Sequence, residues 1–195
     1  MRIILLLVFS CVVAVASVED ATAQGSSAPS AKALADSAIK LSTWEIQPQP
    51  DGELMFLDMP YKNIDKTSYV TLTVSKKIKM ERPDFISVIV PGDIVDTNQG
   101  IYIAFANDTI KNGKRDLAIA KDQRVHLKFE NVNSEFCTAR IIGGYSFNKE
   151  ANKTSDVFGY FMNYDYVLVL FYDFLGHKTV VAPLGRFRKQ YKALK

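Results

Sequence analysis

Cysteine is scarce in this sequence, because Cys11 and Cys137 are the two thiols among 195 residues. Two thiols exclude a disulfide-dense scaffold and a four-cysteine zinc site. Cys11 lies in an N-terminal segment that we expect to be removed, so the mature chain would keep Cys137 alone and form no internal disulfide. Such a fold must be stabilised by its hydrophobic core, and a chain of about 170 residues is large enough to form one.

Excess charge of one sign is also absent. The sequence has 24 lysines and arginines against 21 aspartates and glutamates, which gives a net charge of +3. This excess is too small and too evenly spread to predict nucleic-acid binding. Hydrophobic residues make up 48% of the chain and charged residues 23%, close to the globular average. That composition excludes a wholly disordered, collagen-like or polytopic membrane protein.

An apolar run stands at the N-terminus. Residues 3–18 are apolar or small, between Arg2 and Glu19. A membrane-spanning helix needs about 20 such residues. The shorter run, with its positively charged start, is typical of a secretory signal peptide.

We therefore predict a signal peptide over 1–23, with cleavage after Ala23. Cleavage after Ala16 is one alternative, and lipid attachment at Cys11 is another. The mature protein is expected to be exported to the periplasm, to the outer membrane or into the medium, with no integral membrane span after cleavage.

The composition changes again after this predicted leader. Residues 24–38 are mostly serine, alanine and proline with little bulk, and we interpret them as a flexible tether. Large apolar residues appear steadily from Ile39 on, without a second linker or an internal repeat. We predict one domain over 39–195.

Period-two alternation dominates this domain. Over 124–130, Val125, Leu127 and Phe129 alternate with polar or charged residues, which is typical of a half-buried antiparallel strand. The same pattern, separated by turn signals, predicts strands at 41–47, 53–58, 69–75, 85–90, 101–106, 124–130, 136–142, 166–172 and 178–182. Many short strands at this spacing predict a mainly β fold, namely a single antiparallel β-sandwich-like domain.

Two stretches depart from this alternation and predict helices. In 155–163, apolar residues fall at helical spacing behind Ser155, a residue type that caps helix starts. In 184–194, apolar residues recur every three to four positions and basic residues take the other side. Those basic residues would suit the negative end of the helix dipole. We expect a short internal helix and a C-terminal amphipathic helix.

No motif in the sequence specifies catalysis. The sequence has no glycine-rich phosphate loop, no Gly-x-Ser-x-Gly motif and no pair of carboxylates in an apolar setting. His126 and His177 lie in strand patterns with polar neighbours, so we interpret both as surface residues and not as metal ligands. Cys137 lies in an ordinary strand pattern, and we expect a buried, inert thiol. We predict a protein that is not an enzyme, with no catalytic residue, metal or cofactor.

Two groups of residues are candidates for contact with a partner. The first group is aromatic and consists of Tyr160, Tyr164 and Tyr166. It leads into 166–172, a strand with apolar residues on both faces, which is either the buried centre of a sheet or an exposed apolar patch. The second group is basic, lies on the predicted C-terminal helix, and consists of Arg186, Arg188, Lys189 and Lys192. That helix face is either solvated or a contact for acidic lipid or glycan.

The C-terminal half contains a series of motifs in a characteristic order. The series runs through Phe85–Pro91, Gly100–Ile103, Phe136–Ala139, a short helix, Val167–Leu184, and a last segment with Phe187 and Tyr191–Leu194. This order resembles the invasion-associated locus B family of exported bacterial proteins. The resemblance extends over 85–195 and, through Trp44, over 42–47.

The resemblance implies a compact β-sandwich-like domain that is exported and linked to entry into host cells or persistence in them, without catalysis. We expect a non-enzymatic, virulence-associated protein that binds a host or envelope component, which would be a protein, a glycan or a lipid surface. The alternative is a periplasmic envelope-assembly or stress-protection protein.

The sequence departs from the family pattern at three positions. Val132 stands where family members often carry a second cysteine, and no cysteine follows Trp44. Arg186 replaces the glycine that usually precedes Phe187. The family's disulfides are therefore missing, and Cys137 is left without its usual partner.

Overall fold

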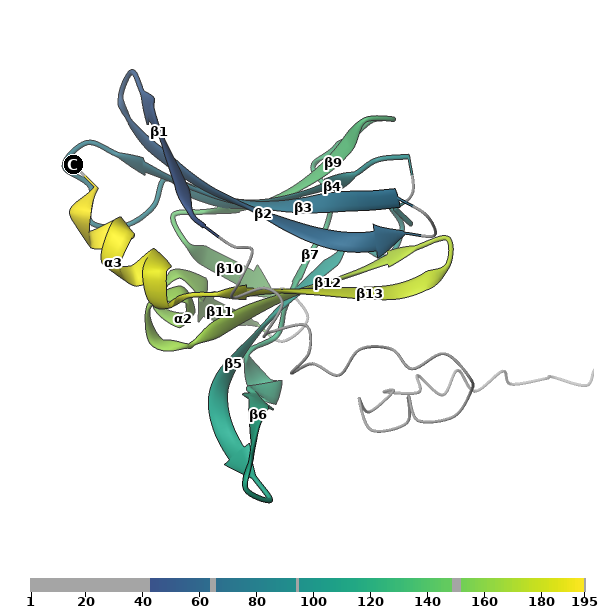
Figure 1. Cartoon of the computed structure of the whole chain (residues 1–195). Coiled ribbons are helices and arrows are strands. Elements are labelled where there is room, and N and C mark those ends of the chain that lie inside the picture. Colours follow the sequence, from purple (N-terminus) through teal and green to yellow (C-terminus); the bar gives the residue numbers. More distant parts are fainter. Residues whose placement is uncertain (1–42, 64–65, 94, 149–151, 195) are drawn as a thin grey trace, which may run out of the picture.

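The computed structural model describes residues 43–63, 66–93, 95–148 and 152–194. The predicted signal peptide and tether, and the predicted start of the domain up to residue 42, lie outside these ranges. Within them the chain is mainly β with antiparallel strands and two α-helices, which confirms the predicted fold class (Figure 1). The strands are β1 (Glu45–Gln49), β2 (Gly52–Asn63), β3 (Lys66–Lys77), β4 (Phe85–Pro91), β5 (Ile101–Lys111), β6 (Lys114–Ile119), β7 (Val125–Leu127), β8 (Asn131–Val132), β9 (Phe136–Ile142), β10 (Tyr145–Asn148), β11 (Lys153–Asp156), β12 (Tyr166–Asp173) and β13 (Gly176–Pro183). The helices are α2 (Val157–Asn163), α3 (Gly185–Ala193) and a short 3₁₀ turn, η1 (Lys121–Gln123).

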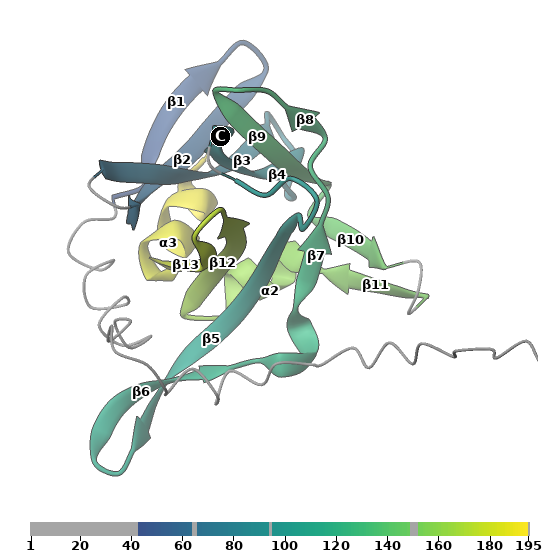
Figure 2. The same ribbon diagram turned by 90° about the vertical axis from the view of Figure 1, so that its right-hand side faces the viewer.

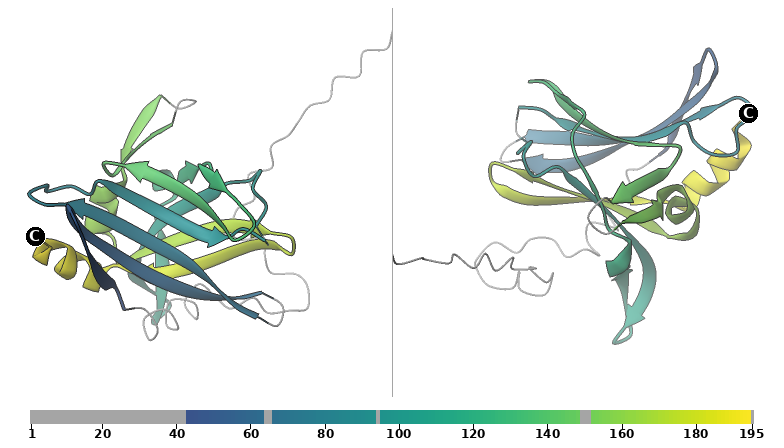
Figure 3. Two further views of the ribbon diagram at one scale, coloured as in Figure 1. Left: turned by 90° about the horizontal axis from the view of Figure 1, so that it is seen from above. Right: turned by 180° about the vertical axis from the view of Figure 1, so that it is seen from behind.

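The strands form two facing sheets and a separate hairpin. The larger sheet has the order β1-β2-β3-β4-β9-β8, and the smaller has the order β13-β12-β5-β6, with β7 also paired to β5. β10 and β11 pair with each other. Figure 3 shows from above and from behind how the two large sheets cover each other. This arrangement is the layered packing that half-buried antiparallel strands favour.

Both sheets turn their apolar side chains inward, because side chains on a strand alternate between its two faces. The two inner faces meet in one core with the buried faces of the helices. This core includes Met55, Leu57, Leu72, Val74, Ile86, Val88, Ile103, Phe105, Val167, Val169 and Phe171. Both predicted helices contribute apolar residues to the same core. A second, smaller buried cluster lies on the other face of the smaller sheet and consists of Ala104, Ala106, Tyr166, Leu168 and Val181.

The C-terminal helix closes one end of the sandwich (Figures 1 and 2). Phe187 is fully buried, and its ring lies 4.9 Å from that of Trp44, the single tryptophan. Tyr191 donates to the carbonyl of Glu81, and Lys76 donates to the carbonyl of Leu194 at 2.8 Å. These contacts join α3 to the larger sheet.

Several predicted strands match the structure closely, others are longer or were missed, and the strand predicted at 124–130 is shorter, since β7 covers Val125–Leu127. The strands predicted at 85–90, 136–142 and 166–172 correspond to β4, β9 and β12. β5 continues well beyond the predicted end at 106, because it forms a hairpin with β6 that projects from the body (Figure 2). The outer half of that hairpin lacks a buried face, so it carries no alternating apolar pattern. The strands β6, β8, β10 and β11 were not predicted for a related reason, since they are short or largely exposed.

The cap of α2 differs from the expected one. Ser155 belongs to β11, and the carboxylate of Asp156 caps the helix by accepting the Gly159 N–H at 2.8 Å. Arg82, in the connection between β3 and β4, donates to the same carboxylate and to the carbonyl of Gly143. Burial alone would raise the pKa of Asp156, but the two hydrogen bonds and the Arg82 charge together hold this pKa below its ordinary value.

Candidate ligand-binding groove at the start of the C-terminal helix

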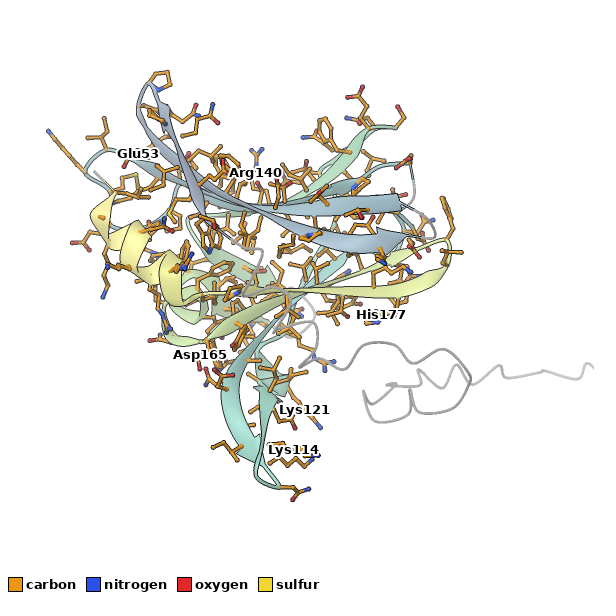
Figure 4. The ribbon with its side chains drawn as sticks, viewed as in Figure 1. Glu53, Lys114, Lys121, Arg140, Asp165 and His177 are labelled. Carbon is orange, nitrogen blue, oxygen red and sulfur yellow. The ribbon has the colours of Figure 1, made fainter. Side chains whose placement is uncertain are left out.

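An open groove with a volume of about 330 Å³ lies where β13 ends and α3 begins. Side chains from β5, from the start of β12 and from the first turn of α3 line it. The lining residues are Asp108, Asp165, Tyr166, Pro183, Gly185, Arg186 and Arg188. Figure 4 labels Asp165 at this junction, below α3. The lining combines cationic, anionic and phenolic groups in one concave surface, which is the composition of a site for a polar ligand.

Backbone hydrogen bonds around Asp165 fix the walls of this groove. The Asp165 N–H donates to the carbonyl of Ala106 at 3.1 Å and to the side-chain oxygen of Asn107 at 3.2 Å. The Leu184 N–H donates to the Asp165 carbonyl at 2.8 Å. Three segments that are distant in the sequence are thus joined at one residue. These bonds hold the backbone segments around the groove together.

The two arginines of the groove have different surroundings. Arg188 donates to Asp165 at 3.4 Å, in a pair whose side chains are both partly exposed. Arg186 is exposed, and it has no hydrogen bond or ion pair with any other residue that the structure describes. One cation of the groove is therefore partly neutralised by a carboxylate, whereas the other is available to a ligand.

Phenolic and carboxylate groups also line the groove. The Tyr166 hydroxyl donates to Asp108 at 3.4 Å, and the Asp108 N–H donates to the second carboxylate oxygen of Asp165 at 3.1 Å. Tyr166 is only 3% exposed, and its hydroxyl is directed at Asp108.

The position of the arginines within α3 opposes the helix dipole. Arg186 and Arg188 lie in the first turn of α3, where the helix end carries a partial positive charge, and no side chain caps that end. Among the basic residues of this helix, Lys192 lies in the last turn, where a cation is favourable. The expectation that these basic residues suit the negative end was therefore wrong for the two arginines. An anion bound at this end of α3 would offset the unfavourable position of the two cations at the start of the helix.

Three of the seven predicted contact residues converge at this groove: Tyr166, Arg186 and Arg188. Tyr160 and Tyr164 are half-buried and pack their rings against Phe105, at 5.3 and 5.7 Å between ring centroids. Lys189 and Lys192 are exposed on α3 but do not line the groove.

Asp108 and Asp165 were missed by the sequence analysis. They are 57 positions apart and are brought together by the pairing of β5 with β12, in which Tyr166 faces Ala106. No local motif marks such a long-range register. The sequence signal available at Asp165 was its place directly before a strand that is apolar on both faces.

The aromatic stretch before and within β12 is largely buried. Phe161 is fully buried, Leu168 is 3% exposed, and Leu170 is half-buried. The interpretation of 166–172 as the covered centre of a sheet is confirmed, and the exposed apolar patch is not found there.

The burial of Cys137 and the exposure of the two histidines agree with the sequence predictions. Cys137 is fully buried, and burial raises the pKa of its thiol, with a smaller opposing effect from a backbone hydrogen bond at Asn133. His126 and His177 are both exposed, and the ring of His126 stacks on Tyr102 at 4.5 Å. The two histidines lie on β7 and β13 of the smaller sheet, whereas Cys137 lies on β9 of the larger sheet.

Side chains able to bind a metal do not gather in groups of three or more within the described ranges. In the same ranges, no helix combines the length and the apolar character needed to cross a bilayer. Comparisons of the chain with protein-family models, with curated proteins and with solved structures found no match.

Proposed function

We propose that this chain is an exported, non-enzymatic protein that binds a component of the host cell or of the bacterial envelope, and so assists entry into host cells or persistence in them. The apolar leader and the order of motifs that resembles the invasion-associated locus B family support export and the link to a host. The observation that carries the binding role is the groove at the start of α3, with its unpaired Arg186.

The chemistry of the groove suits a ligand that carries a phosphate, sulfate or carboxylate group. A guanidinium presents two parallel N–H donors that match such an anion, and the free amides at the start of α3 add further donors. The oxygens of Asp108 and Asp165 lie beside the arginines and can accept hydrogen bonds from hydroxyl groups of the same ligand. A charged glycan or a lipid headgroup offers both kinds of group.

The test is genetic complementation of a bacterial strain that lacks this gene. We expect the unmodified gene to restore host-cell entry and the Arg186→Ala variant to reduce entry by about tenfold, since a lost charge-assisted hydrogen bond changes affinity by that order. Lys189→Ala is the matched control, because Lys189 is an exposed cation of the same helix outside the groove.

Envelope integrity is measured in the same strains through sensitivity to detergent. A deletion strain with unchanged entry and unchanged envelope integrity would refute the proposed function as a whole. Equal entry by the Arg186→Ala variant and the unmodified protein would refute the role of the groove alone.

The alternative function, envelope assembly or stress protection, required the aromatic stretch 160–172 to be exposed to unfolded partners. The burial of Phe161 and Leu168 counts against that mechanism. We therefore place binding at the groove, to which this stretch contributes Asp165 and Tyr166, and not at the apolar side chains of the stretch.

A further inference from the structure

The turn between β12 and β13 exposes two large apolar side chains at one end of the molecule. Phe174 is 77% exposed and Leu175 is 59% exposed. In Figure 1 this turn lies at the end of the sandwich opposite α3, where the hairpin extends past the neighbouring strands. We call residues 172–177 the hairpin tip. Exposed apolar side chains of this size gather at surfaces that make contact with something else.

Hydrogen bonds and an ion pair hold the hairpin tip in a fixed conformation. The Leu175 N–H donates to the carboxylate of Asp173 at 2.8 Å, and the Asp96 N–H donates to the Tyr172 carbonyl at 2.8 Å. Asp173 is 5% exposed and forms an ion pair with Lys178 at 3.5 Å. Phe174 and Leu175 therefore lie in a turn whose conformation is fixed by hydrogen bonds. Less conformational entropy is lost when these side chains insert into a partner.

Rings with polar atoms flank the apolar pair. Tyr172 is 37% exposed, and its ring packs edge-on against the ring of His177 with 5.5 Å between centroids. Figure 4 labels His177 beside this turn. Aromatic side chains with a polar end are favoured at the boundary between water and hydrocarbon. The two apolar side chains would face the acyl chains of a bilayer, and the amphipathic rings of Tyr172 and His177 would lie at its headgroups.

The shape of the hairpin tip favours a lipid surface over a protein pocket. The tip is convex, and a side chain added at Gly176 would meet nothing within 4 Å. A stable protein interface buries about 800 Å² on each partner, which a tip with two apolar side chains does not offer. A fluid bilayer can close around an isolated apolar pair without a complementary pocket.

We propose that the hairpin tip inserts into the interface of a lipid bilayer, with Phe174 and Leu175 reaching the acyl chains and Tyr172 and His177 at the level of the headgroups. Burying each of the two apolar side chains raises the partition coefficient by about tenfold to a hundredfold. The attachment is therefore reversible and comparable in strength to that of a single lipid anchor.

The test is co-sedimentation of the exported protein with phosphatidylcholine vesicles, which are zwitterionic and so exclude attraction by net lipid charge. We expect the unmodified protein to bind, and the Phe174→Ser/Leu175→Ser double variant to lose about a hundredfold in partition coefficient. Ile110→Ser is the matched control, because Ile110 is 78% exposed in the other projecting hairpin. Its binding should equal that of the unmodified protein.

A second measurement detects insertion directly. The Phe174→Trp variant should show a blue shift of its emission with vesicles, and brominated lipids should quench it, whereas the buried Trp44 should respond in neither way. The proposal is overturned if the unmodified protein stays in solution, if the double variant binds as well as the unmodified protein, or if Ile110→Ser reduces binding equally. The result does not depend on the groove, because the double variant changes no residue that lines it.

Discussion

Replacing Asp156 tests how the start of α2 is stabilised, because this carboxylate has two separable roles. It caps the helix through the Gly159 N–H, and it pairs with the Arg82 guanidinium. Asp156→Ala removes both interactions. Asp156→Asn keeps the cap, since asparagine is as good a cap as aspartate, and removes the charge. The difference between the two variants therefore isolates the cap.

The expected magnitudes follow from the exposure of the pair. Asp156 and Arg82 are 45% and 33% exposed, so solvent limits their ion pair to about 0.5–1 kcal/mol. Loss of the cap costs about 1 kcal/mol more. Asp156→Ala should thus lower the free energy of unfolding by about 2 kcal/mol, which corresponds to about 4–8 °C in Tm for a domain of this size. Asp156→Asn should lose about 0.5–1 kcal/mol.

The pH dependence gives an independent check. Because the pKa of Asp156 is lower in the folded protein than its ordinary value of 3.8, the stabilising effect of its charge is fully present above that value. It is lost as the pH falls through the folded pKa. The stability difference between the unmodified protein and Asp156→Asn should therefore shrink as the pH is lowered from 7 to 3.

Urea unfolding, followed by the emission of Trp44, measures these differences. Trp44 is 2% exposed and is the only tryptophan, so its emission reports the loss of the core. If Asp156→Asn loses as much stability as Asp156→Ala, the cap contributes nothing and the reasoning fails. A gap between the unmodified protein and Asp156→Asn that does not change with pH would contradict the role of the charge.

Two further predictions concern the interior. Phe187→Ala should lower the free energy of unfolding by about 3–5 kcal/mol, because Phe187 is fully buried between Trp44 and Phe161. Lys189→Ala is the control, because Lys189 lies on the exposed side of the same helix. This variant should change the free energy of unfolding by less than about 0.5 kcal/mol. Equal losses in urea unfolding would show that α3 is not packed as described. Cys137 should react with a disulfide reagent at least about a hundredfold more slowly in the folded protein than in urea, because it is fully buried and its thiol pKa is raised. Rapid labelling of the native protein would contradict this.

The fold was predictable where burial leaves a periodic pattern in the sequence. β9 and β4 were located closely because buried apolar residues, such as Ala139 and Ile86, recur at every second position along them. The outer part of β5 was missed because its side chains are largely exposed. β6 was missed because its two partly buried apolar residues, Leu117 and Ile119, are too few to form a pattern. Ser155 and Asp156 are both good caps by residue type, and the contact with Arg82 that distinguishes them joins residues 74 positions apart.

The groove was predictable only in part for a similar reason. The basic residues of 184–194 and the tyrosines before β12 stand out by composition, so Arg186, Arg188 and Tyr166 were selected. Their proximity to Asp108 depends on the register between β5 and β12, that is, on which of their residues face each other. This register cannot be predicted from the sequence. The predicted helix 184–194 differs from α3 by one residue at each end, so the boundary was not the source of the error about the dipole. Arg186 and Arg188 already lay near the start of the predicted helix.

A single strand separates the two contact surfaces proposed for this chain. β13 runs from Gly176, at the hairpin tip, to Pro183, in the wall of the groove, and an antiparallel strand of that length spans about 25 Å. The headgroup layer on each side of a bilayer is only about 5–8 Å thick. If the hairpin tip is inserted in a membrane, the groove lies beyond the headgroup layer and is open to the surrounding solution. One protein could then bridge the surface on which it rests and a second object that approaches from outside.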